Sequence, residues 1–283
     1  MSCVQLPVLG WQPDLADHRD YLLGHEHVAH VLSRLKMRTR KSQQPPTNVD
    51  WREYCGAVDD QQGIASSTAH ACISLIQYFE RRASGRLVKL SRLFADHAAM
   101  RIGASVGNAP ASLRTMLKAI VQCGVPPEKY WPYDSSRLEM EPDSFTYSFQ
   151  RDFRSLTYLR LAQHQIEGEQ ILVQLKNFLA AGFPFVFGFP VCTALTSDAE
   201  IAFPSAVDGI LGGQAVMAIG YDDQLRIRSD KGALLVRNSW GTSWGDGGYG
   251  WLPYSYVIRG LSTDYWTLLK PSWLKSGEFE SPD

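Results

Sequence analysis

The sequence predicts an α+β fold in two lobes, and three observations carry this prediction. The chain has 283 residues, 45% hydrophobic and 20% charged, which is ordinary for a soluble protein with a sizeable core. Helical patterns dominate the first half, at 67–85, 91–103 and 112–124. Short β-type runs separated by glycine-rich turns dominate the second half. Helices and strands segregated along the chain are typical of an α+β architecture.

Apolar residues at three- and four-residue spacing define the first helix. Its apolar face is formed by Ala69, Cys72, Ile73, Ile76 and Phe79. Ser66 or Ser67 is suited to cap its start, and Gly85 to end it. Cys72 lies on the apolar face, so we interpret it as a core thiol.

Two further helices are bounded by serine and glycine. We expect them to begin at Ser91 and Ser112 and to end at Gly103 and Gly124. The segment 125–133, with two prolines followed by Tyr-Trp-Pro-Tyr, predicts an irregular loop.

A helix at 170–181 precedes the strand-rich half. The five expected strands lie at 185–189, 215–221, 233–237, 249–252 and 265–269. The polar stretch 222–232 predicts a hairpin loop between the second and third of them.

Composition excludes several classes of function. The 28 basic and 29 acidic residues give a net charge of −1, which disfavours nucleic acid as a partner. No apolar run approaches the roughly 20 residues that span a bilayer, and the start of the chain lacks a secretory signal pattern. The five widely spaced cysteines show no metal-type pairing. We therefore expect no metal, no cofactor, no membrane partner, reduced thiols and a cytoplasmic location.

Punctuation by proline and polar runs divides the chain. We expect an N-terminal extension at 1–48, a helical lobe at 49–150, a strand-rich lobe at 151–272 and a tail at 273–283. A basic helical stretch at 29–38 either packs on the main body or forms a partner-binding arm.

Three segments together resemble the papain-like cysteine peptidases. They are Val-Asp-Trp-Arg at 49–52, Gln-Gly-Ile-Ala-Ser-Ser-Thr-Ala at 62–69, and the set Gly-Gln-Ala-Val at 213–216, Gly-Tyr at 220–221 and Arg-Asn-Ser-Trp-Gly-Thr-Ser-Trp-Gly at 237–245. The resemblance covers about 49–270. It implies the papain-like two-lobed fold, a helical lobe and a barrel-like β lobe with a cleft between them.

The Gln-Gly pair sets the alignment with that family. It places Gln62 at the family's oxyanion-stabilising glutamine and Thr68, six residues on, at the nucleophile. Aligning Gln61 instead would shift the nucleophile position to Ser67 but would lose the match to Gly63.

The third segment supplies the remaining family positions. Gln214, 146 residues after Thr68, falls where the resemblance implies a histidine. Asn238, 24 residues later, and Trp240 match the residues that orient and cover that histidine.

Two of these positions depart from the family chemistry, which needs a thiolate generated by an imidazole. A hydroxyl at Thr68 or Ser67 is a poorer nucleophile, and the carboxamide of Gln214 cannot accept a proton. The family's catalytic pair is therefore degenerate at these positions.

The region before the third helix differs as well. Relatives usually place a glycine there whose backbone pairs with substrate, whereas this chain has Asn108 and Pro110 nearby. A proline would remove the donor and crowd a bound peptide, or it would merely start the helix. Together with Ser67 and Trp240, these two residues are candidates for the cleft.

The leading interpretation is a pseudopeptidase that binds a peptide, a protein or a small ligand. The alternative is an active hydrolase or acyltransferase that uses Thr68 or Ser67 with an unrecognised base. A third possibility is an assembly protein that uses its terminal segments. The identity of the ligand or partner and the oligomeric state stay open.

Overall fold

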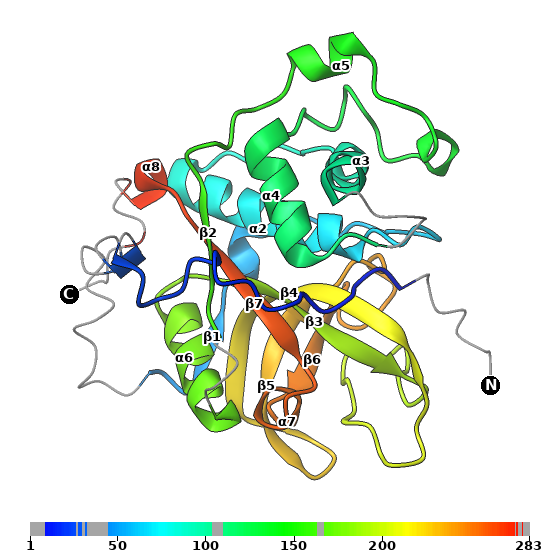
Figure 1. Ribbon diagram of the computed structural model, residues 1–283. Coiled ribbons are helices and arrows are strands. Elements are labelled where there is room, and N and C mark those ends of the chain that lie inside the picture. Colours follow the sequence, from blue (N-terminus) through cyan, green and yellow to red (C-terminus); the bar gives the residue numbers. More distant parts are fainter. Residues whose placement is uncertain are drawn as a thin grey trace.

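The structure of the protein, a computed structural model, describes residues 9–26, 28–29, 32, 45–103, 110–162, 167–274, 276 and 279. Helices gather in one lobe and a single antiparallel sheet forms most of the other (Figure 1). The predicted α+β class and the two-lobed arrangement are confirmed. No helix in the described ranges combines the length and the apolar composition that a membrane span requires.

The helical lobe is built on one long central helix. Its elements are η2 (Arg52–Tyr54), α2 (Ser67–Ser84), α3 (Arg92–Gly103), α4 (Leu113–Cys123), η3 (Ser135–Arg137) and α5 (Ser144–Ser148). The expected helices at 67–85, 91–103 and 112–124 are confirmed to within one residue at each end. Gly85 ends α2 with a φ of 68°, a conformation that glycine adopts without strain.

Serine side chains cap two of the helices. Ser91 Oγ accepts a hydrogen bond from the N–H of Phe94 at 3.1 Å, and Ser112 Oγ accepts one from Thr115 at 3.3 Å. Ser66 precedes α2, but its side chain makes no capping bond to the helix. Its hydroxyl is used elsewhere, as described below.

Within the described residues the sheet has seven strands, and each pairs antiparallel with its neighbours. They are β1 (Asn48–Asp50), β2 (Thr157–Arg160), β3 (Phe185–Cys192), β4 (Ile210–Ile227), β5 (Asp230–Arg237), β6 (Tyr249–Pro253) and β7 (Thr263–Leu269). The order is β2-β7-β3-β4-β5-β6, with β1 added to β4. The helices α6 (Gly168–Ala180), α7 (Ser255–Ile258) and α8 (Pro271–Leu274) complete the described elements.

The expected hairpin loop at 222–232 is wrong in extent. Strand β4 continues to Ile227, and its register with β5 pairs Ile227 with Asp230. The turn is therefore tight, with Arg228 at a φ of 53°. Polar residues in this stretch lie on an exposed face of paired strands, whereas the side chain of Ile227 is buried.

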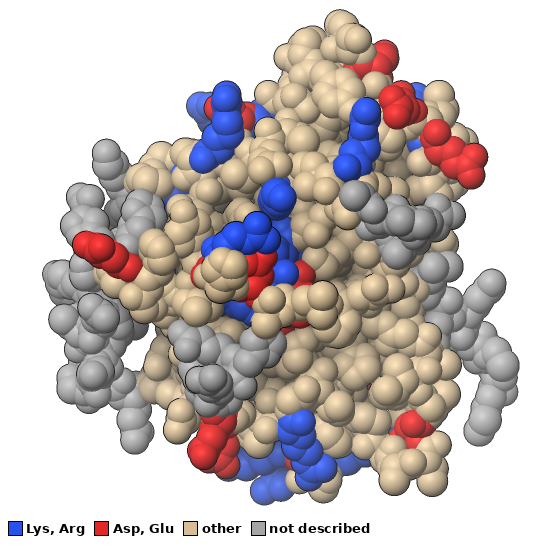
Figure 2. All heavy atoms as spheres, in the orientation of Figure 1, with Lys and Arg blue, Asp and Glu red and all other residues tan. Residues whose placement is uncertain are grey.

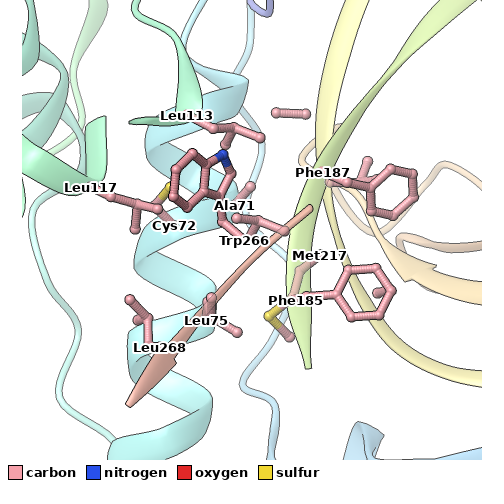
Figure 3. Close-up of a cluster of buried hydrophobic side chains, with 14 of the residues drawn as sticks. Ala71, Cys72, Leu75, Leu113, Leu117, Phe185, Phe187, Met217, Trp266 and Leu268 are labelled. Carbon is pink, nitrogen blue, oxygen red and sulfur yellow. The ribbon is translucent and has the colours of Figure 1, made fainter. Parts of the chain in front are cut away.

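The core lies where α2 packs between α4 and the sheet. Figure 3 shows Ala71, Cys72 and Leu75 on α2 facing Leu113 and Leu117 of α4. Trp266, Leu268, Phe185, Phe187 and Met217 approach from the strands (Figure 3). Cys72 is fully buried, and burial raises the pKa of its thiol well above the usual value. The interpretation of Cys72 as a core thiol is confirmed.

Described residues toward both ends of the chain pack on this body. In the N-terminal part, Val49 pairs with Tyr221 across β1 and β4. At the other end, Trp273 stacks on Phe79 with ring centroids 5.0 Å apart. Of the expected helix at 29–38, residues 29 and 32 are helical, and the rest lies outside the described residues.

Candidate functional site

Ser67 opens the first turn of α2 and points across to the sheet. Its Oγ accepts a hydrogen bond from the backbone N–H of Ala215 on β4 at 3.2 Å. Both residues are buried. This bond joins the two lobes directly beside Gln214.

Gln214 is the centre of a buried amide cluster. Its Nε2 lies 2.9 Å from Gln61 Oε1, 2.9 Å from Asn238 Oδ1 and 3.1 Å from Ser239 Oγ, three acceptors that share its two hydrogens. The Ser239 hydroxyl in turn donates to Gln61 Oε1 at 2.5 Å. Strand β4, the end of β5 and the loop before α2 thus meet at one glutamine side chain.

Several polar atoms of this cluster lack a partner among the described residues. They are Gln214 Oε1, Asn238 Nδ2 and Trp240 Nε1, and each is buried. Trp240 lies edge-on to Trp244, with ring centroids 5.2 Å apart. A buried polar atom without a partner is costly, so this place has unused capacity for hydrogen bonding.

The structure corrects the expected position of one site residue. Gln62 is exposed, with a φ of 52°, and its N–H donates to Asp60 Oδ1 at 2.7 Å. The neighbouring Gln61 is fully buried and carries the contact to Gln214. The turn at Gln62 directs its side chain outward, and the alignment through Gly63 gave no sign of this.

The same shift by one residue moves the residue that faces β4 from Thr68 to Ser67. Ser67, six residues after Gln61, reaches β4, whereas Thr68 is buried with no partner for its Oγ1 among the described residues. Pro110 lies half-buried just before α4, and Asn108 is outside the described residues.

His70 is the histidine nearest to this site along the chain. Its Nδ1 lies 3.1 Å from the carbonyl oxygen of Ser66 and 3.3 Å from the Ser66 hydroxyl. Tyr133 lies edge-on to the ring, and its hydroxyl is 2.6 Å from Ser66 Oγ. Burial, with the positive charge of Arg92, lowers the pKa of His70 to about 3. His70 is therefore a neutral helix residue bonded to Ser66 rather than to Ser67.

The N-terminal segment crosses the junction between the lobes, where the resemblance to the papain-like family implies a cleft, and we call this junction the groove. We name residues 9–20 the strap; Figure 1 shows it in dark blue passing between the helices and the upper ends of β3 and β4. Trp11 is 7% exposed, and its backbone N–H donates to the carbonyl oxygen of Gly213 at 3.0 Å. A Cβ at Gly188 would lie 1.9 Å from the indole, and one at Gly213 would lie 2.5 Å from it. The strap therefore covers the groove immediately before Gln214.

Asp14 anchors the strap at the start of α4. Its Oδ2 accepts from the N–H of Arg114 and from Trp266 Nε1, both at 3.2 Å. The Arg114 guanidinium lies 3.6 Å from Asp14 Oδ1. The Asp14 N–H donates to Asp264 Oδ2 at 2.7 Å.

A wider set of charges surrounds this anchor. Arg114 bonds Asp20 at 2.7 Å, and Arg160 bonds both Asp20, at 3.2 Å, and Asp264. Figure 2 shows basic and acidic side chains gathered near the centre of this face. Burial and the nearby carboxylate of Asp14 raise the pKa of Asp264 to about 6. Two aspartates of the strap and three charged residues of the two lobes thus hold the strap in place.

The described residues contain no cluster of histidine, cysteine, aspartate and glutamate that could hold a metal ion. The cluster around Gln214 is built from amides, hydroxyls and aromatic rings. The arrangement is therefore suited to hydrogen bonding and to shape recognition.

Comparisons with known proteins agree with the two-lobed fold. The family model described as papain family cysteine protease matches residues 45–265. An uncharacterized peptidase C1-like protein of Acanthamoeba polyphaga mimivirus is 30% identical over 218 residues, which cover 74% of this chain and 68% of the relative. The viral cathepsin of Epiphyas postvittana nucleopolyhedrovirus is 25% identical over 72% of this chain, which spans 58% of that relative.

A solved structure extends the likeness over almost the whole chain. Xylellain, a cysteine protease from Xylella fastidiosa, is 31% identical and superposes with a TM-score of 0.71. The match covers 93% of this chain and 96% of xylellain. The chain belongs to the papain family of cysteine proteases.

Proposed function

We propose that this protein binds a peptide segment in its groove and does not hydrolyse it. The observation that carries the proposal is the pair formed by Ser67 and Gln214. With Gln61 as the family's glutamine, Ser67 takes the nucleophile position six residues on, and Gln214 takes the position of the general base.

The chemistry of this pair cannot replace a thiol and an imidazole. A serine hydroxyl needs a base to become nucleophilic, and a carboxamide does not titrate. Loss of both nucleophile and base removes a factor on the order of 10⁶ from the rate. His70 offers no substitute, because its Nδ1 contacts Ser66 rather than Ser67 and because burial lowers its pKa to about 3, which makes the imidazole a weak base.

Gln214 keeps the hydrogen bonds that tie this site together but cannot act as a base. Its Nε2 donates to Asn238 Oδ1 at 2.9 Å, as the ring N–H of a histidine at this position would do. Gln61 and Ser239 also stay tied into the cluster. Retention of the amide framework without a titratable group supports a binding role for the groove.

The alternative, an active hydrolase, is supported by the names of the relatives, which are mostly peptidases. It would require Ser67 or Thr68 to find a base. Ser67 Oγ bonds the N–H of Ala215, and Thr68 Oγ1 has no partner in the described part of the chain. We therefore favour the binding protein.

Turnover of fluorogenic peptide libraries tests the proposal. The full chain, its Ser67→Ala variant and a strap variant, Trp11→Ala/Asp14→Asn, are assayed side by side. The strap variant is needed because a covered groove would also prevent turnover. We expect all three to show the same background rate.

A rate in the full chain or the strap variant that Ser67→Ala abolishes would overturn the proposal. Addition of Ser67→Cys and Gln214→His to the strap variant is the matched positive control. Turnover in that variant would show that the groove admits the substrates used.

A further inference from the structure

We propose that the groove selects extended peptide segments by two anchors, a tryptophan and an acidic residue three positions later. The tryptophan enters a slot over Gly188 of β3 and Gly213 of β4, and the carboxylate binds at the start of α4. This inference rests on the proposed function and names the class of partner that it leaves open. The strap of this chain is the template for such a partner.

The slot fits an indole because two glycines on the neighbouring strands β3 and β4 leave its floor free of side chains. The ring of Trp11 lies so close to both that a methyl group at either position would overlap it. Trp11 is 7% exposed, and its Nε1 has no partner among the described residues. Selection at this anchor therefore depends on the shape of the ring, with one backbone bond to Gly213 setting the register.

The second anchor is a built carboxylate site. The N–H of Arg114 lies in the first turn of α4, an 11-residue helix whose N-terminal end favours negative charge. The Trp266 Nε1 donates from the floor of the site, and the Arg114 guanidinium lies nearby. The Asp14 side chain is 1% exposed, so the carboxylate is held away from water.

The residues between the anchors do not contribute to selection. Gln12 and Pro13 are exposed, as is Leu15 beyond the second anchor, at 86%. Pro13 restricts the backbone before Asp14 and so lowers the entropy lost on binding. The recognised pattern is therefore Trp-x-x-Asp in an extended chain.

The strap competes with any such partner because it is tethered to the groove. A tethered segment acts at an effective concentration on the order of millimolar. A free peptide should therefore bind the unmodified chain more weakly than a variant whose strap lacks both anchors.

Calorimetric titration with synthetic peptides tests this. The host is the full chain with Trp11→Ala and Asp14→Asn, and the probe is the acetylated and amidated segment Leu-Gly-Trp-Gln-Pro-Asp-Leu of residues 9–15. We expect the probe to bind the host at least about tenfold more tightly than the unmodified chain. Probes with alanine for tryptophan or asparagine for aspartate should bind the host about 30-fold and about tenfold more weakly.

A cycle with Trp266→Phe in the host separates the carboxylate site from general packing. The preference for aspartate over asparagine should shrink severalfold, because one donor to the carboxylate is gone. If the double variant does not fold, Trp11→Leu serves as the host with the same expected order of affinities.

Equal binding of the three probes would overturn the two-anchor code but would leave the proposed function standing, which is judged by turnover. Absence of binding of every probe to a folded host would also overturn the two-anchor code. A dimer of the unmodified chain that the strap substitutions dissolve would identify a second copy as the occupant and overturn the proposal of a separate partner.

Discussion

The contact between Trp11 and Gly188 allows a sharp test of how the strap is held. Gly188 lies in β3, and its φ is not positive, so alanine there is compatible with the backbone. A Cβ would nevertheless lie 1.9 Å from Trp11 Cε2, with the two next-nearest atoms also in the indole. Gly188→Ala must therefore displace the ring or the strand.

The magnitude follows from two opposing effects. Overpacking against Trp11 costs about 1–3 kcal/mol in the free energy of unfolding. Replacement of glycine within a strand by alanine returns roughly 0.5–1 kcal/mol, because less backbone entropy is lost on folding. In the unmodified chain the first effect dominates. In a Trp11→Ala background the second remains, so the substitution becomes neutral or slightly stabilising.

Urea unfolding, followed by circular dichroism, is measured for the unmodified chain, Gly188→Ala, Trp11→Ala and the double variant. The four free energies of unfolding give the coupling between the two positions. We expect a coupling energy of about 2 kcal/mol between the two positions. Equal destabilisation by Gly188→Ala in both backgrounds would refute the argument that the indole fills this slot.

Three further outcomes are expected. Burial raises the pKa of Asp96 to about 7, so the contribution of this residue to stability is complete below about pH 4 and is lost as the pH rises to about 7. The Asp96→Asn variant should lose this pH dependence and should be more stable than the unmodified chain at pH 8 by about 2–4 kcal/mol in urea unfolding. Parallel pH profiles of the two proteins would contradict this expectation. Asp59→Ala leaves the buried guanidinium of Arg92 without its main partner and should cost about 3–5 kcal/mol, whereas a loss below 1 kcal/mol would show that this pair is not needed. Ser112→Ala removes the cap bond to Thr115 and should lower the melting temperature by an amount equivalent to about 1 kcal/mol, with Ser112→Gly as the milder control and an unchanged melting temperature as the contrary result.

The main helices and five strands were predictable because their signals are local. The apolar face of α2 and the serines that cap α3 and α4 are readable within a few residues of sequence. The short elements β1 and α5 lack such a signal. Strand β1 has three residues and exists because Tyr221 and its neighbours on β4 provide partners.

The positions of the site residues could be predicted from the sequence only to within one residue. Gln214 and Asn238 were found from a long specific motif, and the structure brings their side chains together. Gln61 and Gln62 have the same side chain, so only the backbone turn at Gln62 decides which one enters the cluster.

The strap gave no signal in the sequence that linked it to the groove. Leu9 and Trp11 have no periodicity, and the glycines that they pack against, at 212, 188 and 213, lie about 180–200 residues away along the chain, a separation at which local patterns carry no information. The contact requires glycine at 188 and 213, because a Cβ at either position would overlap the indole of Trp11. This requirement is recognised only once the structure brings the three residues together.

Covalent labelling of Ser67 tests the absence of catalytic activation most directly. The strap variant, with its groove uncovered, is incubated with a fluorophosphonate, and the intact mass and the digested peptides are analysed. We expect no adduct at Ser67 or Thr68, because neither hydroxyl has a base among the described residues. An adduct at Ser67 that disappears in the Ser67→Ala variant would contradict it and show that the groove carries an activated nucleophile.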